Sequence, residues 1–274
     1  MGGVPTMSNA EPIKFQVDLL KFEVYPSRQA AGMAAALAAA EAMRVGVMSG
    51  RDLGVIFATG ASQLATLRAL TSLEEVPWEQ IIGFHMDEYE NLSADHSASF
   101  RRYLRDELTR KVPIKEFNEI DGASLNADLF CRQYAARLRA ADPQLCLLGI
   151  GENGHLAFND PFLCSFDDPI DVKLVSLDTA CREQQVAEGW FPTVDDVPAR
   201  AITLTVPPLV RVPKLIVSVP GKRKAHIVRR VILEPVSNAC PATLLKMHRD
   251  ATVYLDDESS SELADVLASS TLAK

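Results

Sequence analysis

The sequence predicts an α/β fold in which a mostly parallel sheet is covered by helices on both faces. Short runs such as DLGVIF at 52–57 and QLCLLGI at 144–150 are almost continuously apolar, which is typical of strands buried on both sides. Helix-forming stretches alternate with these runs, as in parallel sheets built from strand–helix–strand units. Because no Gly- or Pro-rich linker divides the 274 residues, we expect a single domain.

The first half of the chain alternates helices with two strands. The alanine-rich stretch 29–43 predicts a helix, since Ala has the best intrinsic helix propensity. The strand at 52–57 is followed by the turn ATGAS and a helix at 63–73. A second strand at 81–86, IIGFHM, leads into the polar loop DEYENLSADHS and then a helix near 97–110.

The second half contains the strand at 144–150 and four later β-branched runs. These runs are VKLVSL, AITLTV, KLIVSV and ATVYL, and a helix at 222–233 separates the last two. Ligands of open parallel sheets bind beyond the carboxyl ends of the strands. The loops after the first three strands, and the one after KLIVSVP, are therefore the expected site.

Composition and charge narrow the class of protein. The chain is 47% hydrophobic and 23% charged, as in ordinary globular proteins. Its net charge of −8 argues against nucleic-acid binding, and no apolar stretch has the roughly 20 residues of a membrane span. The start of the chain lacks the pattern of a signal peptide. The 5 cysteines show no CxxC spacing, which indicates reduced thiols, a cytoplasmic location and no structural zinc site.

The turn after the first strand contains Thr59, Gly60, Ala61 and Ser62. It precedes a helix, whose free N–H groups and partial positive charge suit a phosphate. Gly60 would let the backbone approach closely, and the two hydroxyls would add hydrogen bonds. The alternative is a plain strand-to-helix turn with Ser62 as its N-cap.

The second strand ends at an acidic pair, Asp87 and Glu88. A carboxylate at this edge of the sheet is a candidate general base, since burial tunes carboxylates to move protons near neutral pH. A solvated loop with a capping acid is the alternative.

The third strand runs into GIGENGHLAFNDP, residues 149–161. Its glycines indicate backbone packed against a ligand or held at positive φ. His155 would face the cleft from there, and His titrates nearest to neutral pH. Asp160, five residues later, could orient the imidazole, whereas a core histidine is the alternative.

Three basic residues, Lys222 to Lys224, open the helix after KLIVSVP. A charge run of this kind is usually a solvated face. Positive charge is nevertheless disfavoured at a helix N-terminus, so an anionic partner would explain it.

Three segments together resemble the glucosamine-6-phosphate deaminase/isomerase family: FHMDEY, GIGENGHLAFNDP and the strand followed by PGKRKA. More distantly, the chain is similar to 6-phosphogluconolactonases, which share the fold. The resemblance spans about residues 30–260. It implies one Rossmann-like α/β domain over 1–274, with a flexible N-terminal tail at about 1–14. It also implies isomerisation of an amino-sugar phosphate with loss of ammonia, without metal or cofactor.

The resemblance assigns roles by position. Asp87 corresponds to the base that moves a proton from C2 to C1 of the sugar, and His155 to the imidazole that opens the ring. Asp160 stands where the family usually has the glutamate partner of that histidine, and Asn153 where members have Asp or Asn. Lys224 matches the phosphate-binding lysine, and ATGAS falls on the phosphate-binding turn.

Several positions depart from the family pattern. Ala61 and Gln63 replace residues common in the phosphate turn, and His85 stands where asparagine is usual. Asp160 is one methylene shorter than glutamate. The segment 178–192 departs from the one in which better-known members place a phosphate-contacting arginine, so that Arg182 is only a stand-in.

Three functions follow from these patterns. The first is a deaminase/isomerase acting on glucosamine 6-phosphate or a close epimer. The second is a sugar-phosphate lactonase, in which His155 would activate water and no base at C2 is needed. The third is a sugar-phosphate sensor without turnover, against which the presence of both Asp87 and His155 argues. The expected partner is a small sugar phosphate, not a membrane or nucleic acid, and a homo-oligomer is possible.

Overall fold

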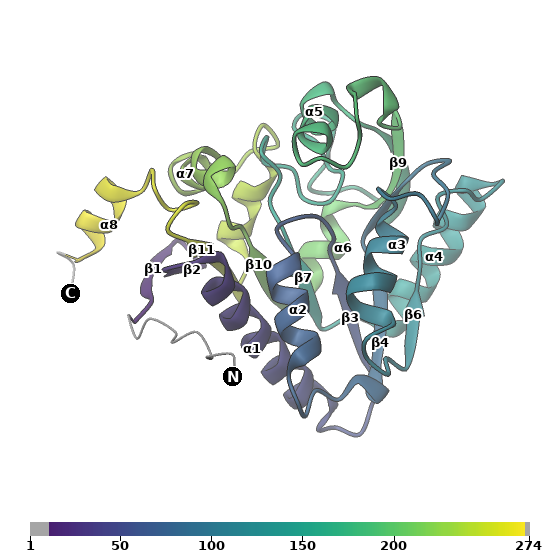
Figure 1. Cartoon of the computed structure of the whole chain (residues 1–274), viewed down its shortest axis with the longest axis horizontal. Coiled ribbons are helices and arrows are strands. Elements are labelled where there is room, and N and C mark those ends of the chain that lie inside the picture. The colour runs from purple at the N-terminus through teal and green to yellow at the C-terminus, as the bar shows by residue number, and fades with distance from the viewer. Residues whose placement is uncertain (1–10, 272–274) are drawn as a thin grey trace, which may run out of the picture.

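A computed structural model describes residues 11–271. Its centre is a sheet with the strand order β1-β2-β11-β10-β7-β3-β4-β6 (Figure 1). β1 and β2 pair antiparallel, and every other neighbouring pair in this sheet is parallel, which confirms the predicted architecture. The strands are β1 (Ile13–Val17), β2 (Leu20–Tyr25), β3 (Leu53–Phe57), β4 (Ile81–His85), β6 (Glu116–Asn118), β7 (Leu145–Leu148), β10 (Lys214–Ser218) and β11 (Ala251–Asp256).

The order of the strands reverses between β3 and β7. From β3 the chain moves outward through β4 to β6, and from β7 it moves the other way through β10 to β11. Loops leaving two neighbouring strands in opposite directions open a crevice at the carboxyl edge, where ligands bind in such sheets. The turn after β3 and the glycine loop after β7 lie at this point.

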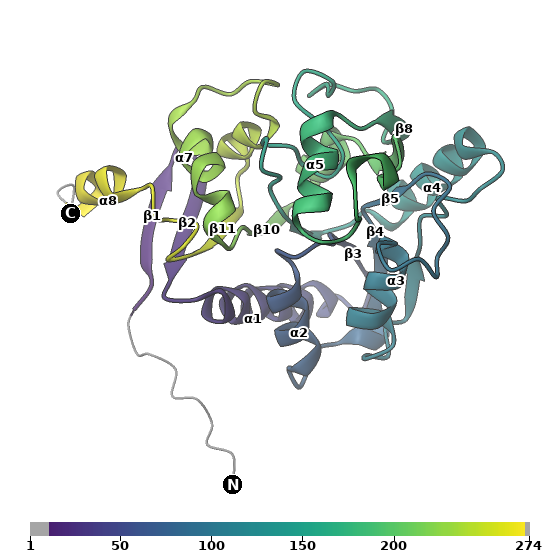
Figure 2. The same cartoon turned by 45° about the horizontal axis from the view of Figure 1, so that its top comes forward.

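Helices cover both faces of the sheet (Figure 2). Val55 and Phe57 pack toward α1, α2 and α3 on one face, whereas Ile56 between them packs toward α4, α6 and α7 on the other. This alternation explains why β3 is apolar at every position. The helices are α1 (Arg28–Val47), α2 (Leu64–Ser72), α3 (Phe100–Leu104), α4 (Ala127–Ala141), α5 (Thr179–Ala187), α6 (Val206–Arg211), α7 (Ala225–Leu233) and α8 (Ala264–Thr271).

A second sheet corrects the predicted assignment of two strands. VKLVSL and AITLTV form β8 (Val172–Ser176) and β9 (Arg200–Leu204), which pair antiparallel outside the main sheet. Their third partner is β5 (Asp87–Tyr89), so the first three residues of the predicted polar loop are a strand. An aromatic cluster that includes Tyr89, Phe100 and Phe158 supports this small sheet.

One helix and the N-terminal segment differ from the prediction in detail. The predicted helix near 97–110 is α3 followed by a π-helical turn at Arg105–Thr109. The β1–β2 hairpin was not predicted. Residues 1–10 of the predicted tail lie outside the described residues, and β1 begins at Ile13, inside the tail's predicted boundary.

Contrary to the expectation from the sequence, α1 passes the length and composition test for a membrane-spanning helix, and it alone does so among the described residues. Five of its alanines and Met43 are buried against α2 and the sheet. Small side chains on that face permit close packing: a Cβ at Gly32 would lie 2.6 Å from Cβ of Ala65 in the first turn of α2. This face of α1 is therefore part of the core.

Candidate active site

A pocket lies at the carboxyl ends of β3, β4 and β7, with α5 forming one wall. Six of the predicted site residues line it: Thr59, Gly60, Ser62, Asp87, His155 and Lys224. Four others do not line it: Ala61, Asn153, Asp160 and Arg182. The structure thus brings six of the ten predicted residues together in the pocket, whereas Asn153 and Asp160 contact His155 without lining it.

The turn after β3 presents open backbone N–H groups. Gly60 has φ +89°, a backbone conformation that residues other than glycine rarely adopt. Its carbonyl accepts a hydrogen bond from the Tyr103 hydroxyl at 3.0 Å. The N-cap of α2 is Gln63, not Ser62, and no side chain caps this helix. Gln63 instead donates to the Leu148 carbonyl at 3.1 Å, which fixes the turn to β7. Ala61 lies in a hollow next to the pocket.

Lys224 is the one residue of the basic run that lines this pocket. The Lys222 ammonium donates to the Ser261 hydroxyl at 2.7 Å, and Arg223 donates to the Ala187 carbonyl at 2.7 Å. Lys224 is only 7% exposed, yet no acceptor within residues 11–271 bonds its Nζ. Burial lowers the pKa of Lys224, and the charges of Glu188 and Glu152 oppose this effect. A buried ammonium without a partner is costly unless an anion joins it.

The glycine loop is shaped around the imidazole of His155. A Cβ at Gly151 would lie 2.2 Å from Nε2 of His155, so the ring packs directly on the glycine backbone. Gly154 has φ +95°, and a Cβ there would meet Cys240 Sγ at 2.8 Å. The His155 backbone N–H donates to Oδ1 of Asn153 at 3.0 Å. These glycines hold the imidazole at the pocket wall.

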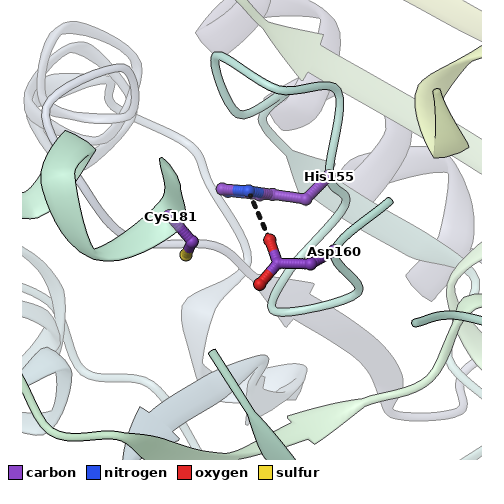
Figure 3. Close-up of side chains that lie close together, drawn as sticks. All are labelled: His155, Asp160 and Cys181. Atoms are coloured by element: carbon purple, nitrogen blue, oxygen red, sulfur yellow. Dashed lines mark ion pairs between the residues drawn. The ribbon is translucent and has the colours of Figure 1, made fainter. Parts of the chain in front are cut away.

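His155 and Asp160 form a pair (Figure 3). Nδ1 of His155 lies 3.2 Å from Oδ1 of Asp160, although not in line for a straight hydrogen bond. Asp160, one methylene shorter than the glutamate usual in the family, still reaches the ring. Its carboxylate also accepts from Nδ2 of Asn153 at 3.2 Å and from the Asp178 backbone N–H at 3.0 Å. Burial raises the pKa of Asp160, but the contact with His155 and the hydrogen bonds from Asp178 and Asn153 outweigh it and leave that pKa below its usual value.

Cys181 completes a group of three possible metal ligands with His155 and Asp160. Their ligand atoms lie within 4.8 Å of one another. Figure 3 shows the three side chains close together. Burial, followed by the charges of Asp160 and Asp178, raises the pKa of the Cys181 thiol well above its usual value. Metals bind the thiolate, so a cation at this group would have to displace the proton of Cys181. His155 and Asp160 form their pair without the thiol.

Asp87 and Glu88 are adjacent and have opposite environments. Asp87 lines the pocket at 6% exposure, and its Oδ1 has no hydrogen-bond partner among the described residues. Burial, assisted by the charge of Glu88, raises the pKa of Asp87 to about 8. Glu88 points the other way and accepts hydrogen bonds from the Ser99 hydroxyl and the Arg101 backbone N–H at 2.8 and 2.9 Å. Asp87 is thus available for chemistry, whereas Glu88 anchors the start of α3.

Helix α5 and its C-cap residue bring three polar residues that the sequence reasoning missed: Gln184 and Gln185 in the helix and Glu188 at its end. Their spacing of one and three places them on one helical face, which is a signal the sequence did contain. Arg182, on the same helix, does not line the pocket. Its Nη2 donates to the carbonyls of Val194 and Val197 at 2.5 and 3.1 Å, so the arginine holds the following loop.

A family model and curated relatives match this chain, and they agree on the same family. Residues 26–158 match the family described as glucosamine-6-phosphate isomerases/6-phosphogluconolactonase. A glucosamine-6-phosphate deaminase of Listeria innocua is 32% identical over 225 residues, 82% of this chain and 94% of that protein. Another, from Exiguobacterium sibiricum, is 31% identical over 213 residues, 78% of this chain and 82% of that protein.

Solved structures share the fold. One described as a monomeric glucosamine-6-phosphate deaminase superposes with a TM-score of 0.80 at 27% identity, covering 88% of this chain and 99% of that one. The 6-phosphogluconolactonase of Trypanosoma brucei superposes with a TM-score of 0.73 at 18% identity, covering 89% and 98%. The second similarity concerns the fold alone.

Proposed function

The chain belongs to the glucosamine-6-phosphate isomerase/6-phosphogluconolactonase family, and we propose that it is an amino-sugar-phosphate deaminase. It would convert glucosamine 6-phosphate, or a close epimer, and water into a ketohexose 6-phosphate and ammonia. Relatives at 31% and 32% identity carry the name of this activity. The observation that favours it most is the unpartnered Asp87 carboxyl, in the same pocket as His155.

The phosphate would bind where the pocket is positive. Lys224 offers a buried ammonium that no acceptor within residues 11–271 bonds. The start of α2, which no described side chain caps, offers backbone N–H groups beside the hydroxyls of Thr59 and Ser62. Charge-assisted hydrogen bonds to phosphate are the stronger class of hydrogen bond. Holding the phosphate end would orient the sugar chain toward Asp87 and His155, which makes the proton transfers effectively intramolecular.

His155 would open the sugar ring. Opening requires a proton to leave the anomeric hydroxyl and another to reach the ring oxygen, and an imidazole does both near neutral pH. Asp160 lies beside the ring, and its own lowered pKa keeps it anionic. Asn153 holds both the backbone of His155 and the carboxylate of Asp160.

Asp87 would carry out the isomerisation. In the open-chain aldose its carboxylate takes the proton from C2 and returns it to C1, while a proton passes from the amino group to the C1 oxygen. C1 thereby becomes CH2OH, and C2 is left with a C=N bond. Water then adds to C2, and ammonia departs to leave the ketose. The raised pKa of Asp87, about 8, gives a base strong enough to abstract a carbon-bound proton. Hydrolysis of a lactone involves no such transfer, so the placement of Asp87 favours the deaminase over the lactonase.

The direct test is ammonia release from a panel of hexosamine 6-phosphates, with 6-phosphogluconolactone hydrolysis measured beside it. We expect ammonia and ketohexose 6-phosphate in equal amounts from at least one epimer and little hydrolysis of the lactone. Fast lactone hydrolysis without ammonia from any amino sugar would replace the proposal with the lactonase. A sugar-phosphate substrate made in metabolism also accords with the cytoplasmic location that we propose.

A further inference from the structure

Two adjacent glutamines of α5 line the pocket and differ in how their side-chain amides are hydrogen-bonded. The Gln184 carboxamide is bonded at both ends: Oε1 accepts from the Glu152 backbone N–H at 2.9 Å, and Nε2 donates to Glu188 at 2.7 Å. Gln185 is bonded at one end only, where Oε1 accepts from the Tyr89 hydroxyl at 2.8 Å. Within the described part of the chain, nothing bonds Nε2 of Gln185. That amide group is available to a ligand.

The hydrogen bond from Tyr89 fixes which end of the Gln185 carboxamide is available. Tyr89 is fully buried, and burial raises the pKa of its hydroxyl well above the usual value. The hydroxyl therefore stays protonated and donates, so it selects the oxygen of Gln185 and leaves the two N–H groups free. Gln185, itself 5% exposed and lining the pocket, presents donors whose orientation is set by a residue outside the lining.

Tyr89 is held rigidly beside the proposed base. It is two residues after Asp87 in β5, so both side chains lie on the same face of that strand. The rings of Phe100 and Phe158 pack at 5.0 and 5.3 Å from the Tyr89 ring. The same two phenylalanines line the pocket, so this part of the wall is otherwise aromatic.

We propose that Gln185 determines substrate specificity by donating a hydrogen bond to a hydroxyl oxygen of the sugar chain on the Asp87 side, and that Tyr89 positions it. The inference rests on the proposed function, since it concerns how the same pocket recognises its sugar. A neutral N–H donor suits an uncharged hydroxyl, whereas the phosphate has the ammonium of Lys224. A site built to bond a hydroxyl discriminates strongly against sugars that lack it.

The test is a double-mutant cycle on kcat/KM for the hexosamine 6-phosphate that wild type deaminates. Gln185→Leu should lower kcat/KM by roughly 10–100-fold, mainly through KM, because a substrate hydroxyl is left without its donor. Tyr89→Phe should lower it by about 3–10-fold, because the carboxamide is then free to rotate. Adding Tyr89→Phe to Gln185→Leu should change kcat/KM by less than about twofold, since residues of one hydrogen-bonded unit are not additive.

Three further variants and measurements make the outcome decisive. Gln185→Glu still accepts from Tyr89 but has no N–H groups, so it should match Gln185→Leu in its loss and serves if the leucine variant does not fold. Tyr25→Phe removes a tyrosine hydroxyl bonded to Glu23, away from the pocket, and should leave kcat/KM unchanged. Thermal unfolding of every variant shows that a kinetic loss is not a folding defect.

Two results would overturn the proposal. One is an unchanged kcat/KM in both Gln185 variants, and the other is a double mutant whose loss is the product of the single losses. Failure of the proposed function would give a different result, because wild type itself would release no ammonia from any hexosamine 6-phosphate. The proposed role of Gln185 would then be withdrawn as well.

Discussion

The two sides of the pocket differ in charge and in origin. The main-sheet side consists of loops that leave parallel strands, and it offers backbone N–H groups, the Lys224 ammonium and His155. The small-sheet side, formed by β5 and α5, offers Asp87, Gln185 and Glu188. A sugar phosphate has a charged end and an end where carbon-bound protons move. We propose that the main-sheet side binds the phosphate and opens the ring through His155, and that the small-sheet side moves the carbon-bound proton.

The largest expected loss tests the imidazole on the main-sheet side. His155→Gln should reduce kcat by a factor on the order of 10²–10⁴, the range for a lost acid–base group. Binding of the phosphorylated sugar should remain, because the groups proposed to hold the phosphate are untouched. Steady-state kinetics with the ring-closed substrate provides the measurement, and unaltered turnover would remove His155 from the mechanism.

The next prediction concerns the acid on the small-sheet side and the pH dependence of stability. The pKa of Asp87 is about 8 in the folded protein against an ordinary 3.8, so the folded state keeps a proton that the unfolded chain has released. Stability from this group is complete below about pH 4 and is lost as the pH rises through 8. Asp87→Asn should abolish this loss of stability. Above pH 8 its free energy of unfolding should exceed that of wild type by on the order of a few kcal/mol.

Chemical denaturation at pH 4 and pH 9 measures this effect. The difference between the variant and wild type isolates Asp87, because Glu88 is present in both proteins. Equal differences at the two pH values would mean that Asp87 is not held in a protonated state by burial.

A smaller effect tests the positive side. Lys224→Ala should weaken binding of the phosphorylated sugar by about 1.5–3 kcal/mol, the range for hydrogen bonds to charged groups. The unphosphorylated sugar should bind poorly to both proteins. Lys222→Ala is the matched control, since its ammonium bonds Ser261 outside the pocket. Calorimetry that shows equal losses for both sugars would make Lys224 structural.

The smallest functional effect is expected at Arg182, which bonds a loop and does not line the pocket. Arg182→Ala should lower the melting temperature, because the carbonyls of Val194 and Val197 lose their donor. Affinity for the phosphorylated sugar should stay within about twofold of wild type. A loss as large as that of Lys224→Ala would restore the arginine to the phosphate site.

The sequence predicted the main-sheet side better than the small-sheet side, for a physical reason. Continuous apolar strands such as β3 and β7 indicate a parallel sheet, and the loops that follow them must meet at one edge. β8 and β9 are equally β-branched, and nothing local states which sheet they join. Gln185 was missed because its role depends on Tyr89, 96 residues away in the chain.

The same reasoning explains why some single residues could be predicted and others could not. Gly151 and His155 were predicted together because a glycine loop at a strand end is a local pattern. Asp87 was predicted as a base, but its distinction from Glu88 depends on the direction of each side chain, which the sequence does not contain. Arg182 was only a stand-in, and the partners of a long side chain are set by tertiary packing.

The central claim is that Asp87 moves the proton between C2 and C1 while the opposite side holds the phosphate. The most direct measurement is ammonia and ketose formation by wild type and Asp87→Asn, with sugar-phosphate binding followed by calorimetry. We expect Asp87→Asn to bind the substrate and to lose ammonia release, and wild type in D₂O to place deuterium at C1 of the ketose. Ammonia release at the wild-type rate by Asp87→Asn, or no ammonia from wild type alongside fast lactone hydrolysis, would contradict the account.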